Sequence, residues 1–581
     1  MYIEKIEINN FRNLDGIKMN FDSKMNFIVG ENNLGKSNLL DCLNTVFNYS
    51  RFKEDDFFNP EEKINIYLTL ILEKEEMGTF DDFFDPNDSK RINIRIEQEN
   101  PNEYLKYYHV ESSSEISSAK IRNVNFIKYS SLRSPKDELS FDKNKGVGKV
   151  LSFIVKEFIK DKKQDATKIT DFIIEDEFNS LLRFINEKIN LIDIFKQFSI
   201  NAHLEADLDT LLYKMLVLKE KGMYNLEYSG HGVQFFSMIS LVLLEHIIKI
   251  LDYKDRPRYE NENGDKYISV IMCLDEPEIH LHPYMQRSLI KYILDILNNE
   301  NENFRKLLKD LFELDDIRGQ AILVTHSPNI ILNNYKQVVR FFVENDKISV
   351  VSGSDITIEK KTEKHLLRNL PYFKEAFFSR CAIIVEGDSE MGAFPLFAEK
   401  MGIDLDKNGI IIIKADGKNS ISKIAELLEK FKIPICAFAD RDDKKGDKIS
   451  EWNFIYEITA CRDFEEEIID NLLNNKGESF LDCILNKFDE NWRGAPVEED
   501  LLKTKNDGCK VINETSTVKC SEDIPNNKQL HKLYYLSLSQ KKSITLGRII
   551  GEILPKELIP ESFKKLLLEA ERLSKKVTQY E

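Results

Sequence analysis

Residues 30–37 read Gly-Glu-Asn-Asn-Leu-Gly-Lys-Ser, after an apolar stretch at 25–29 and before a segment with leucines at positions 39, 40 and 43. A strand, this G-x-x-x-x-G-K-[ST] pattern and a helix, in that order, are typical of a phosphate-binding loop. The glycines let backbone N–H groups close around phosphate oxygens, and the start of the helix adds positive potential. We expect Lys36 to contact the β- and γ-phosphates of ATP and Ser37 to bind Mg²⁺. The predicted nucleotide-binding residues are Gly30, Asn32, Asn33, Gly35, Lys36 and Ser37.

A pair of acidic residues, Asp275 and Glu276, follows a second apolar stretch at 268–274. Open α/β sheets bind their ligands outside the carboxyl ends of the strands, which is where this pair would lie. Asp275 is therefore predicted to bind the Mg²⁺ of the nucleotide, directly or through water. Glu276 is predicted to orient and polarise the attacking water. The run continues through His280 and His282, which we assign to a loop rather than to a metal site.

Two further segments indicate the class of ATPase. Residues 228–234 read Tyr-Ser-Gly-His-Gly-Val-Gln and resemble the signature motif of ABC-type ATPases. In that class the signature Ser and Gly, here Ser229 and Gly230, bind the γ-phosphate held by the partner subunit, so that ATP joins a head-to-tail dimer. His326 follows an apolar stretch at 321–324, as the switch histidine of the class does. An ordinary turn and a structural histidine are the alternative interpretations.

The order of these motifs, with the run Asn-Phe-Arg-Asn at 10–13, resembles the RecF/SMC-like branch of ABC ATPases. Two neighbouring acids, Asp55 and Asp56, are the candidates for the Q-loop residue of that branch. Between the motifs, the spacing of apolar residues predicts amphipathic helices over 150–221 and a return to strands and loops over 229–327.

A second set of acids follows apolar stretches in the last third of the chain. Glu386 ends the stretch 381–385 and Glu390 comes four residues later, on the same side of a helix if one starts here. Asp440 and Asp442 follow the stretch 435–439. Carboxylates this close repel one another unless a cation is bound, and an all-oxygen site favours Mg²⁺ or Mn²⁺. This pattern resembles the Toprim domain of topoisomerases, primases and some nucleases; a solvated acidic surface is the alternative.

Two later segments are predicted to complete this site. The acids at 463–467 precede an amphipathic helix, and Glu466 or a neighbour is predicted to be a further metal ligand, although a helix start favours acids in any case. Lys542, in the run Lys-Lys-Ser-Ile-Thr-Leu-Gly-Arg at 541–548, is predicted to neutralise charge that develops in the transition state. Lys541 is the alternative, and an ordinary exposed basic pair is the competing interpretation.

An ABC ATPase with a long insert, followed by a Toprim domain, resembles the OLD (overcoming lysogenization defect) endonuclease family, whose architecture includes the Gabija anti-phage nuclease subunit. The resemblance implies an α/β fold with a RecF/SMC-like ABC ATPase head, a helical insert and a Toprim domain. The domains would be an N-terminal ATPase lobe at 1–145, a helical dimerisation insert at 146–222, a C-terminal ATPase lobe at 223–365 and a Toprim nuclease domain with a C-terminal extension at 366–581.

The same resemblance implies a function and a set of site residues. The protein would be a nucleotide-regulated, divalent-metal-dependent DNA endonuclease in anti-phage defence, acting as a homodimer or larger homo-oligomer with a helicase as a partner protein. Glu276, His326, Glu386, Asp440, Asp442 and Lys542 would be catalytic. The metals would be bound by Glu386, Glu390, Asp440, Asp442 and a family glutamate within 465–467, and Lys542 would match a family lysine.

Composition sets the outer limits of these interpretations. The chain has 581 residues, of which 42% are hydrophobic and 31% charged, a balance typical of globular proteins. Its net charge of -17 excludes a simple electrostatic DNA binder, although local basic patches and bound metal ions still permit contact with nucleic acid. Its eight cysteines include no C-x-x-C pair, so a zinc site or a disulfide framework is not expected.

The sequence predicts no contact with a membrane. The most apolar stretch, 235–244, is followed by Glu245 and is shorter than the roughly 18 residues that a membrane span needs. The first ten residues carry charges and no apolar core of a signal peptide, so we expect a cytosolic protein.

Two other functions are compatible with the motifs. One is an SMC-like, ATP-gated DNA-binding clamp whose Toprim site is inactive. The other is a nucleotide-sensing scaffold that recruits a helicase. A topoisomerase or primase is less favoured, because no strand-passage or polymerase module accompanies the acidic motif.

Overall fold

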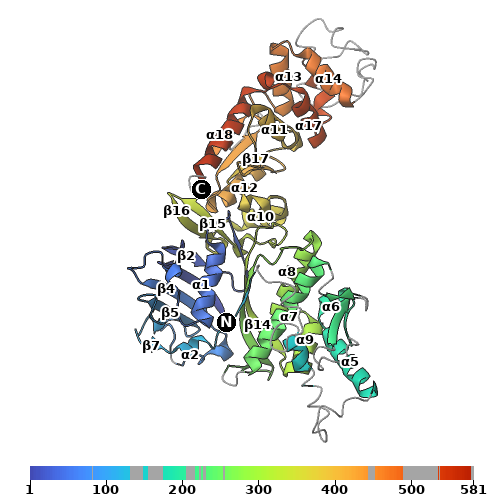
Figure 1. Cartoon of the computed structure of the whole chain (residues 1–581). Coiled ribbons are helices and arrows are strands. Elements are labelled where there is room, and N and C mark those ends of the chain that lie inside the picture. Colours follow the sequence, from blue (N-terminus) through green and yellow to red (C-terminus); the bar gives the residue numbers. More distant parts are fainter. Residues whose placement is uncertain are drawn as a thin grey trace. The chain divides into compact units, whose positions relative to one another are not determined.

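The computed structural model describes the chain except for residues 82, 131–147, 155–156, 158–174, 205–215, 221–223, 227–229, 253–255, 442–451, 489–530, 532–533, 536 and 578–581. The chain divides into two compact units. The first contains Met1–Phe342 and Ile348–Asp355, and the second contains Val343–Lys347 and Ile356–Glu581. Many of the elements of both units are labelled in Figure 1.

An antiparallel sheet forms one part of the first unit. Its six strands have the order β2-β1-β4-β5-β6-β7. Alternating apolar residues give each long strand one buried face, which is the usual pattern when one side of a sheet covers a core. The strands are β1 (Tyr2–Asn9), β2 (Ile17–Asn20), β4 (Ile64–Ile71), β5 (Arg91–Gln98), β6 (Lys106–His109) and β7 (Glu115–Ile116).

A seven-stranded sheet carries the nucleotide motifs. Its order is β12-β13-β14-β3-β15-β16, with β8 also paired to β13. Strands β8, β13, β14, β3 and β15 run parallel, and β3 is buried throughout, as expected for a parallel sheet covered on both faces. The strands are β3 (Met25–Val29), β8 (Asn125–Tyr129), β12 (Tyr259–Glu260), β13 (Lys266–Asp275), β14 (Asp316–Val324), β15 (Val338–Glu344) and β16 (Lys347–Ser352).

The helices of the first unit include one that the sequence analysis did not predict. Residues 231–252 form the long helix α7, where strands and loops were expected. The run of apolar residues in α7 lacks the polar face that marks an amphipathic helix, and this is why the pattern was misread. The described helices are α1 (Lys36–Asn48), α2 (Ser118–Ile121), α5 (Glu175–Ile189), α6 (Asp193–Gln197), α7 (His231–Asp252), α8 (Pro283–Leu297) and α9 (Glu302–Phe312).

The predicted insert at 146–222 is not purely helical. Besides α5 and α6 it contributes β9 (Ile200–Leu204) and β10 (Leu216–Glu220), which form a three-stranded antiparallel sheet with β11 (Tyr224–Asn225). The alternation in β9, Ile-Asn-Ala-His-Leu, covers only five residues of a segment whose spacing otherwise predicts helices, and this is why it was missed.

The second unit is a parallel α/β layer structure. Its four-stranded sheet has the order β18-β17-β19-β20, and every pairing is parallel. Phe394, Phe438, Phe464 and Phe563 meet in the core. The elements are α10 (Lys360–Phe373), β17 (Cys381–Val385), α11 (Asp388–Met401), β18 (Ile410–Lys414), α12 (Lys418–Lys430), β19 (Ile435–Ala439), β20 (Ile455–Ile458), α13 (Phe464–Asn474), α14 (Glu478–Phe488), α17 (Ile544–Ile553) and α18 (Glu561–Val577).

The start of this unit differs from the predicted domain boundary. The boundary between 365 and 366 would cut α10, whereas all of α10 belongs to the second unit. The structure therefore places the division at about residue 356.

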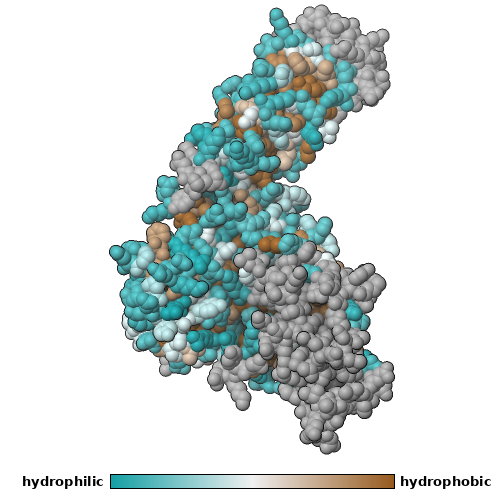
Figure 2. Space-filling view, viewed as in Figure 1, coloured by the Kyte–Doolittle hydropathy of each residue, from teal (hydrophilic) through white to brown (hydrophobic). Residues whose placement is uncertain are grey.

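One helix among the described residues is long and apolar enough to cross a membrane by length and composition. It is Gly232–Leu251 within α7, so the expectation that this apolar stretch is too short was wrong. The helix is 88% buried inside the protein, as is common for a core helix. On the face shown in Figure 2, the strands of the antiparallel sheet carry mainly hydrophilic residues, and apolar residues reach the surface at several places in the second unit.

Candidate functional site

The phosphate-binding loop of the first unit connects β3 to α1. Gly30 has a φ of +139°, and a Cβ there would lie 2.4 Å from the carbonyl oxygen of Phe341, so only glycine fits. Gly35 precedes α1 with a φ of +79°, and a Cβ there would meet the side chain of Asn13 at 2.5 Å. The path of the loop therefore requires glycine at two positions, where its backbone packs closely against Phe341 and Asn13.

Lys36 and Ser37 connect this loop to the neighbouring strand. The ammonium of Lys36 donates to the carbonyl of Gly30 at 3.0 Å, and its burial lowers the pKa of Lys36 to about 8, against the effect of Glu276 and Asp275. The hydroxyl of Ser37 donates to Oδ1 of Asp275 at 2.9 Å. The predicted Mg²⁺ ligands from β13 and α1 thus lie side by side.

The predicted water-orienting pair also converges on this point. Oε1 of Glu276 lies 3.4 Å from Nε2 of His326. Glu276 has a φ of +46°, an uncommon conformation for a side-chain-bearing residue that often occurs at functional sites. A hollow of about 770 Å³ is lined by Asn32, Asn33, Gly35, Lys36, Ser37, Asn38, Glu276 and His326. These residues come from three parts of the sequence and meet at the carboxyl ends of β3, β13 and β14.

Glu278 is a residue of this site that the sequence analysis missed. Its buried Oε1 accepts hydrogen bonds from the hydroxyl of Thr325 at 2.7 Å and from the backbone N–H of His326 at 2.8 Å. Burial raises the pKa of Glu278. Its position two residues after Glu276 was the available signal, but the Pro-Glu sequence was treated as a loop.

The Asn-Phe-Arg-Asn run packs against the start of α1. Arg12 donates to Oδ1 of Asn38 at 2.6 Å and forms ion pairs with Asp41 and Asp56, both at 2.8 Å. Asp56 is therefore bound to Arg12, and neither Asp55 nor Asp56 is among the residues that line the hollow. The contacts of Arg12 therefore indicate that the run at residues 10–13 supports the start of α1.

The signature segment is only partly described. Ser229 lies outside the described residues, whereas Gly230 stands exposed at the start of α7, where its carbonyl accepts from the N–H groups of Val233 and Gln234. Gly230 is not among the residues that line the hollow. Of the two histidines assigned to a loop, His280 adopts a φ of +63° and His282 precedes α8.

The acids of the second unit meet at the carboxyl end of its sheet. Oε2 of Glu386 accepts a hydrogen bond from the backbone N–H of Asp440 at 3.1 Å, which joins the ends of β17 and β19. Burial and the nearby Glu465 raise the pKa of Glu390 to about 7, and burial and Glu390 raise the pKa of Asp440 to about 9. Within the described residues these two groups thus share a strongly negative environment, which a cation would relieve.

A lysine and two further acids complete this cluster. The ammonium of Lys542 lies 2.8 Å from Oε2 of Glu465 and 3.0 Å from Oδ2 of Asp463. Burial opposes the charge of Lys542, but Glu465 and Asp463 outweigh it and raise the pKa of Lys542 above its ordinary value. The hydroxyl of Ser389 donates to Oε1 of Glu465 at 2.5 Å. Lys542, the predicted lysine, therefore lies in the cluster.

The acid that joins this cluster is Glu465 rather than Glu466. Glu465 is fully buried against Lys542 and Ser389, whereas Oε2 of Glu466 accepts from the backbone N–H of Arg462 at 2.7 Å. Glu467 accepts from the N–H of Ala460 at 2.7 Å. The structure thus selects one of three adjacent glutamates, all of which the sequence analysis had considered.

Close packing of two helices brings Lys542 to this place. A Cβ on Gly547 of α17 would lie 1.9 Å from the carbonyl of Ser389 in α11, and a Cβ on Gly392 would lie 2.2 Å from the carbonyl of Ile544. Lys542 stands just before α17, so the close approach at these two glycines sets the distance of its ammonium from the carboxylates.

The donor atoms available here are carboxylate oxygens, which suit a hard divalent cation. In the described part of the chain, no three His, Cys, Asp or Glu side chains form a ready group for one metal ion. Asp442, the fourth predicted ligand, lies outside the described residues.

Comparison with known families identifies two domains in the chain. The sequence model of the AAA ATPase domain matches residues 1–146 and 79–331, more than half of the chain. The model of the TOPRIM domain of overcoming lysogenization defect protein-like proteins matches residues 377–442. The chain therefore belongs to the AAA ATPase domain family and joins that domain to an OLD-like TOPRIM domain. The predicted resemblance, fold class and enzyme class are confirmed.

Individual relatives are more distant. The chain is 22% identical to the Old nuclease of Escherichia phage P2 over 512 residues, which are 80% of each chain. It is 25% identical over 433 residues to the endonuclease GajA of Bacillus cereus (strain HuB5-5), covering 69% of this chain and 59% of that relative. A solved SMC head bound to the C-winged helix domain of ScpA is 16% identical with a TM-score of 0.35, covering 62% of this chain and all of that one.

Proposed function

We propose that the chain is a nucleotide-regulated, divalent-metal-dependent endonuclease that cuts phosphodiester bonds in DNA. The observation that carries this proposal is the meeting of Glu386 and Asp440 at the end of the second sheet, beside the ion pair of Lys542 with Glu465. Support for nuclease chemistry comes from the OLD-like TOPRIM match and from two relatives named as nucleases.

The proposed reaction is hydrolysis of a phosphodiester. A water oxygen bonds to phosphorus, the bond from phosphorus to the leaving oxygen breaks, the water loses a proton and the leaving oxygen gains one. Mg²⁺ or Mn²⁺ at Glu386, Glu390, Asp440 and Asp442 would supply positive charge to the reacting oxygens. The ammonium of Lys542 would stabilise the charge on the non-bridging phosphoryl oxygens, since Glu465 and Asp463 hold it in its protonated form.

The first unit would bind ATP and set the arrangement of the subunits. Gly230 does not line the hollow around Lys36 and Ser37 of its own chain. This supports the interpretation that the signature segment contacts the nucleotide of a partner subunit. We therefore propose a homodimer or larger homo-oligomer, to which the insert at 146–222 contributes. Glu276 and His326 would orient the water that attacks the γ-phosphate.

The biological setting follows from the family resemblance. We propose a cytosolic protein of anti-phage defence that works with a helicase partner.

A plasmid-nicking assay tests this function. It would use the full chain with Mg²⁺ or Mn²⁺, with and without ATP, and compare the wild type with Glu386→Ala. Glu466→Gln is the control, because this acid at the start of α13 accepts from the backbone N–H of Arg462 and lies outside the cluster. Metal-dependent nicking that is lost in Glu386→Ala and kept in Glu466→Gln supports the proposal.

An ATP-gated DNA-binding clamp whose Toprim site is inactive is the alternative. A clamp would retain DNA in the presence of ATP without cutting it under any metal condition. DNA retention and DNA cleavage measured in the same reactions therefore separate the two functions.

A further inference from the structure

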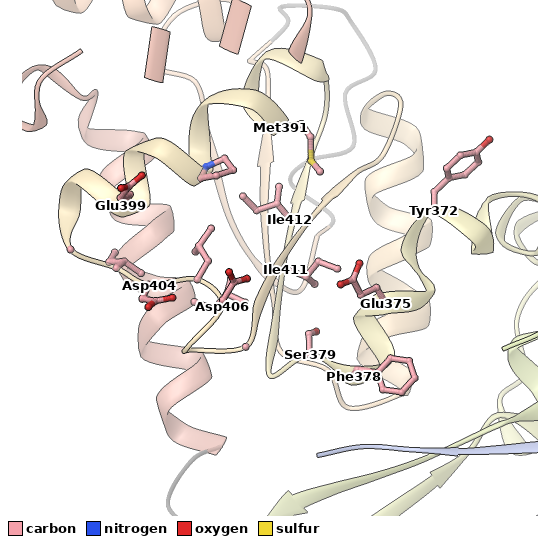
Figure 3. A pocket seen from close by; sticks show the side chains of 16 residues that line it. Tyr372, Glu375, Phe378, Ser379, Met391, Glu399, Asp404, Asp406, Ile411 and Ile412 are labelled. Atoms are coloured by element: carbon pink, nitrogen blue, oxygen red, sulfur yellow. The ribbon is translucent and has the colours of Figure 1, made fainter. Parts of the chain in front are cut away.

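A second hollow in the Toprim unit lies away from the acidic cluster, along an edge of the sheet. Its volume is about 870 Å³ (Figure 3). The floor is β18, and the walls come from α11 with the segment that follows it and from α10 with residues 374–379. We call this hollow the β18 groove. None of the residues assigned to nuclease chemistry lines it.

The β18 groove exposes the edge of a strand. In the described part of the chain β18 pairs only with β17, so its other side is an edge of the sheet. Three consecutive residues, Ile410, Ile411 and Ile412, line the groove. Successive side chains of a strand point to opposite faces of the sheet. A hollow that is lined by all three therefore extends over the edge of the sheet from one face to the other.

The backbone at this edge is oriented for a further strand. The carbonyl of Gly409 accepts from the N–H groups of Arg380 and Cys381, so the backbone of residue 409 faces β17. Backbone direction alternates along a strand, and the N–H and carbonyl of Ile412 therefore face away from β17. Edges of this kind bind extended peptides by adding them as a strand, with side-chain pockets giving specificity.

The charge of the groove indicates its occupant. Glu375, Glu399, Asp404 and Asp406 line it and are all exposed, and its described lining contains no lysine, arginine or histidine. The apolar floor and the partly exposed Met391 and Leu405 suit alternate apolar side chains. Nucleic acid would be repelled by these carboxylates. A second copy of the groove would bring four more carboxylates against them, which disfavours pairing of two β18 edges.

We propose that the β18 groove binds an extended segment of another protein in which lysine or arginine alternates with apolar residues, and that this segment adds to the sheet as a fifth strand beside β18. The apolar residues would contact Ile411 or Ile412, and the cations would lie by the four carboxylates. The proposal concerns a partner surface and does not depend on the nuclease function.

Fluorescence anisotropy with the full chain tests this inference. The probe is a labelled, end-capped peptide, Lys-Val-Lys-Ile-Lys-Val-Lys, and the comparison peptide has prolines in place of its apolar residues. Both carry the same charge, but the second cannot form a strand because proline lacks the backbone N–H. We expect the first peptide to bind at least about tenfold more tightly.

Two sets of variants locate the binding. Ile412→Pro removes the N–H that faces away from β17, and edge strands tolerate proline. This variant should bind the two peptides with equal affinity. The double variant Glu375→Lys/Asp406→Lys should bind the first peptide about tenfold or more weakly. The control double variant Glu557→Lys/Glu561→Lys changes two exposed acids outside the groove, and should alter this affinity by less than about twofold.

The outcomes decide the proposal. Equal binding of the two peptides, absence of binding, or equal effects of the two charge-reversal pairs would overturn it. Concentration-dependent self-association that Ile412→Pro removes would overturn it in favour of a second copy as occupant. If Ile412→Pro fails to fold, the surface charge variants decide alone, since all four positions are exposed.

Discussion

The ammonium of Lys542 lies 2.8 Å from the carboxylate of Glu465, a fully buried side chain from a distant part of the sequence. Glu465 also accepts the hydroxyl of Ser389 on α11. This pair joins three segments of the Toprim unit at the point where β17 and β19 end, so the position of Lys542 depends on a carboxylate that need not touch the substrate.

Glu465→Gln should therefore reduce DNA nicking much more than Glu466→Gln. The amide of this variant would keep the hydrogen bond from Ser389 but lose the charge that orients Lys542. Changes of this kind next to a metal site lower activity by roughly 10- to 100-fold. Nicking rates at saturating Mn²⁺ measure the effect, and the matched change at 466 should stay within about twofold. Equal losses in both variants would show that the selection of Glu465 is wrong.

Gly547→Ala should damage the same site from a distance. The new Cβ would lie 1.9 Å from the carbonyl of Ser389, so α17 must move away from α11 and take Lys542 with it. Overpacking of this kind destabilises by about 1–3 kcal/mol. Thermal unfolding and nicking should both decline, while ATP binding by the first unit is unchanged. Glu552→Ala, an exposed position of the same helix, should change stability by less than about 0.5 kcal/mol.

The sequence predicts those parts of the sites that depend on local order along the chain. The loop at 30–37 needs one strand, two glycines and one helix in succession, and Glu386 and Asp440 each follow their own strand directly. Parallel strands place such residues at one edge of the sheet, so their convergence follows from the fold class.

The rest depends on packing that the sequence does not display. Three adjacent glutamates at the start of α13 are equivalent in sequence, and only the packing of α13 on the sheet decides that Glu465 turns inward. The role of Glu278 is visible only in the folded chain, where its carboxylate lies beside the end of β14 and accepts from the N–H of His326. The sheet of β9, β10 and β11 was missed because its strands are at most five residues long, and such short strands are stabilised by pairing rather than by their own pattern.

Glu278→Ala should impair ATP hydrolysis while nucleotide binding is kept. The change leaves the buried hydroxyl of Thr325 and the N–H of His326 without their acceptor, and His326 should lose its alignment with Glu276. Each unsatisfied buried group costs about 1–3 kcal/mol. The measurement is kcat for ATP hydrolysis beside the Kd of a labelled nucleotide. Glu278→Gln retains an acceptor oxygen at the same place and should restore most of the rate; failure of this rescue would contradict the positioning role.

Lys36→Ala should weaken ATP binding and thereby show how nucleotide controls the nuclease. The ammonium of Lys36 points at the carbonyls of the loop and should turn to the β- and γ-phosphates when ATP binds. Loss of a charged hydrogen bond costs about 1.5–3 kcal/mol, which corresponds to roughly 10- to 150-fold weaker binding. Nicking measured across an ATP titration should then shift to higher ATP concentrations by the same factor, in whichever direction ATP acts on the wild type. Arg51→Ala, an exposed basic position outside the hollow, is the control and should leave the titration in place. An ATP response that is unchanged in Lys36→Ala would mean that nucleotide acts on cleavage through a site other than this loop.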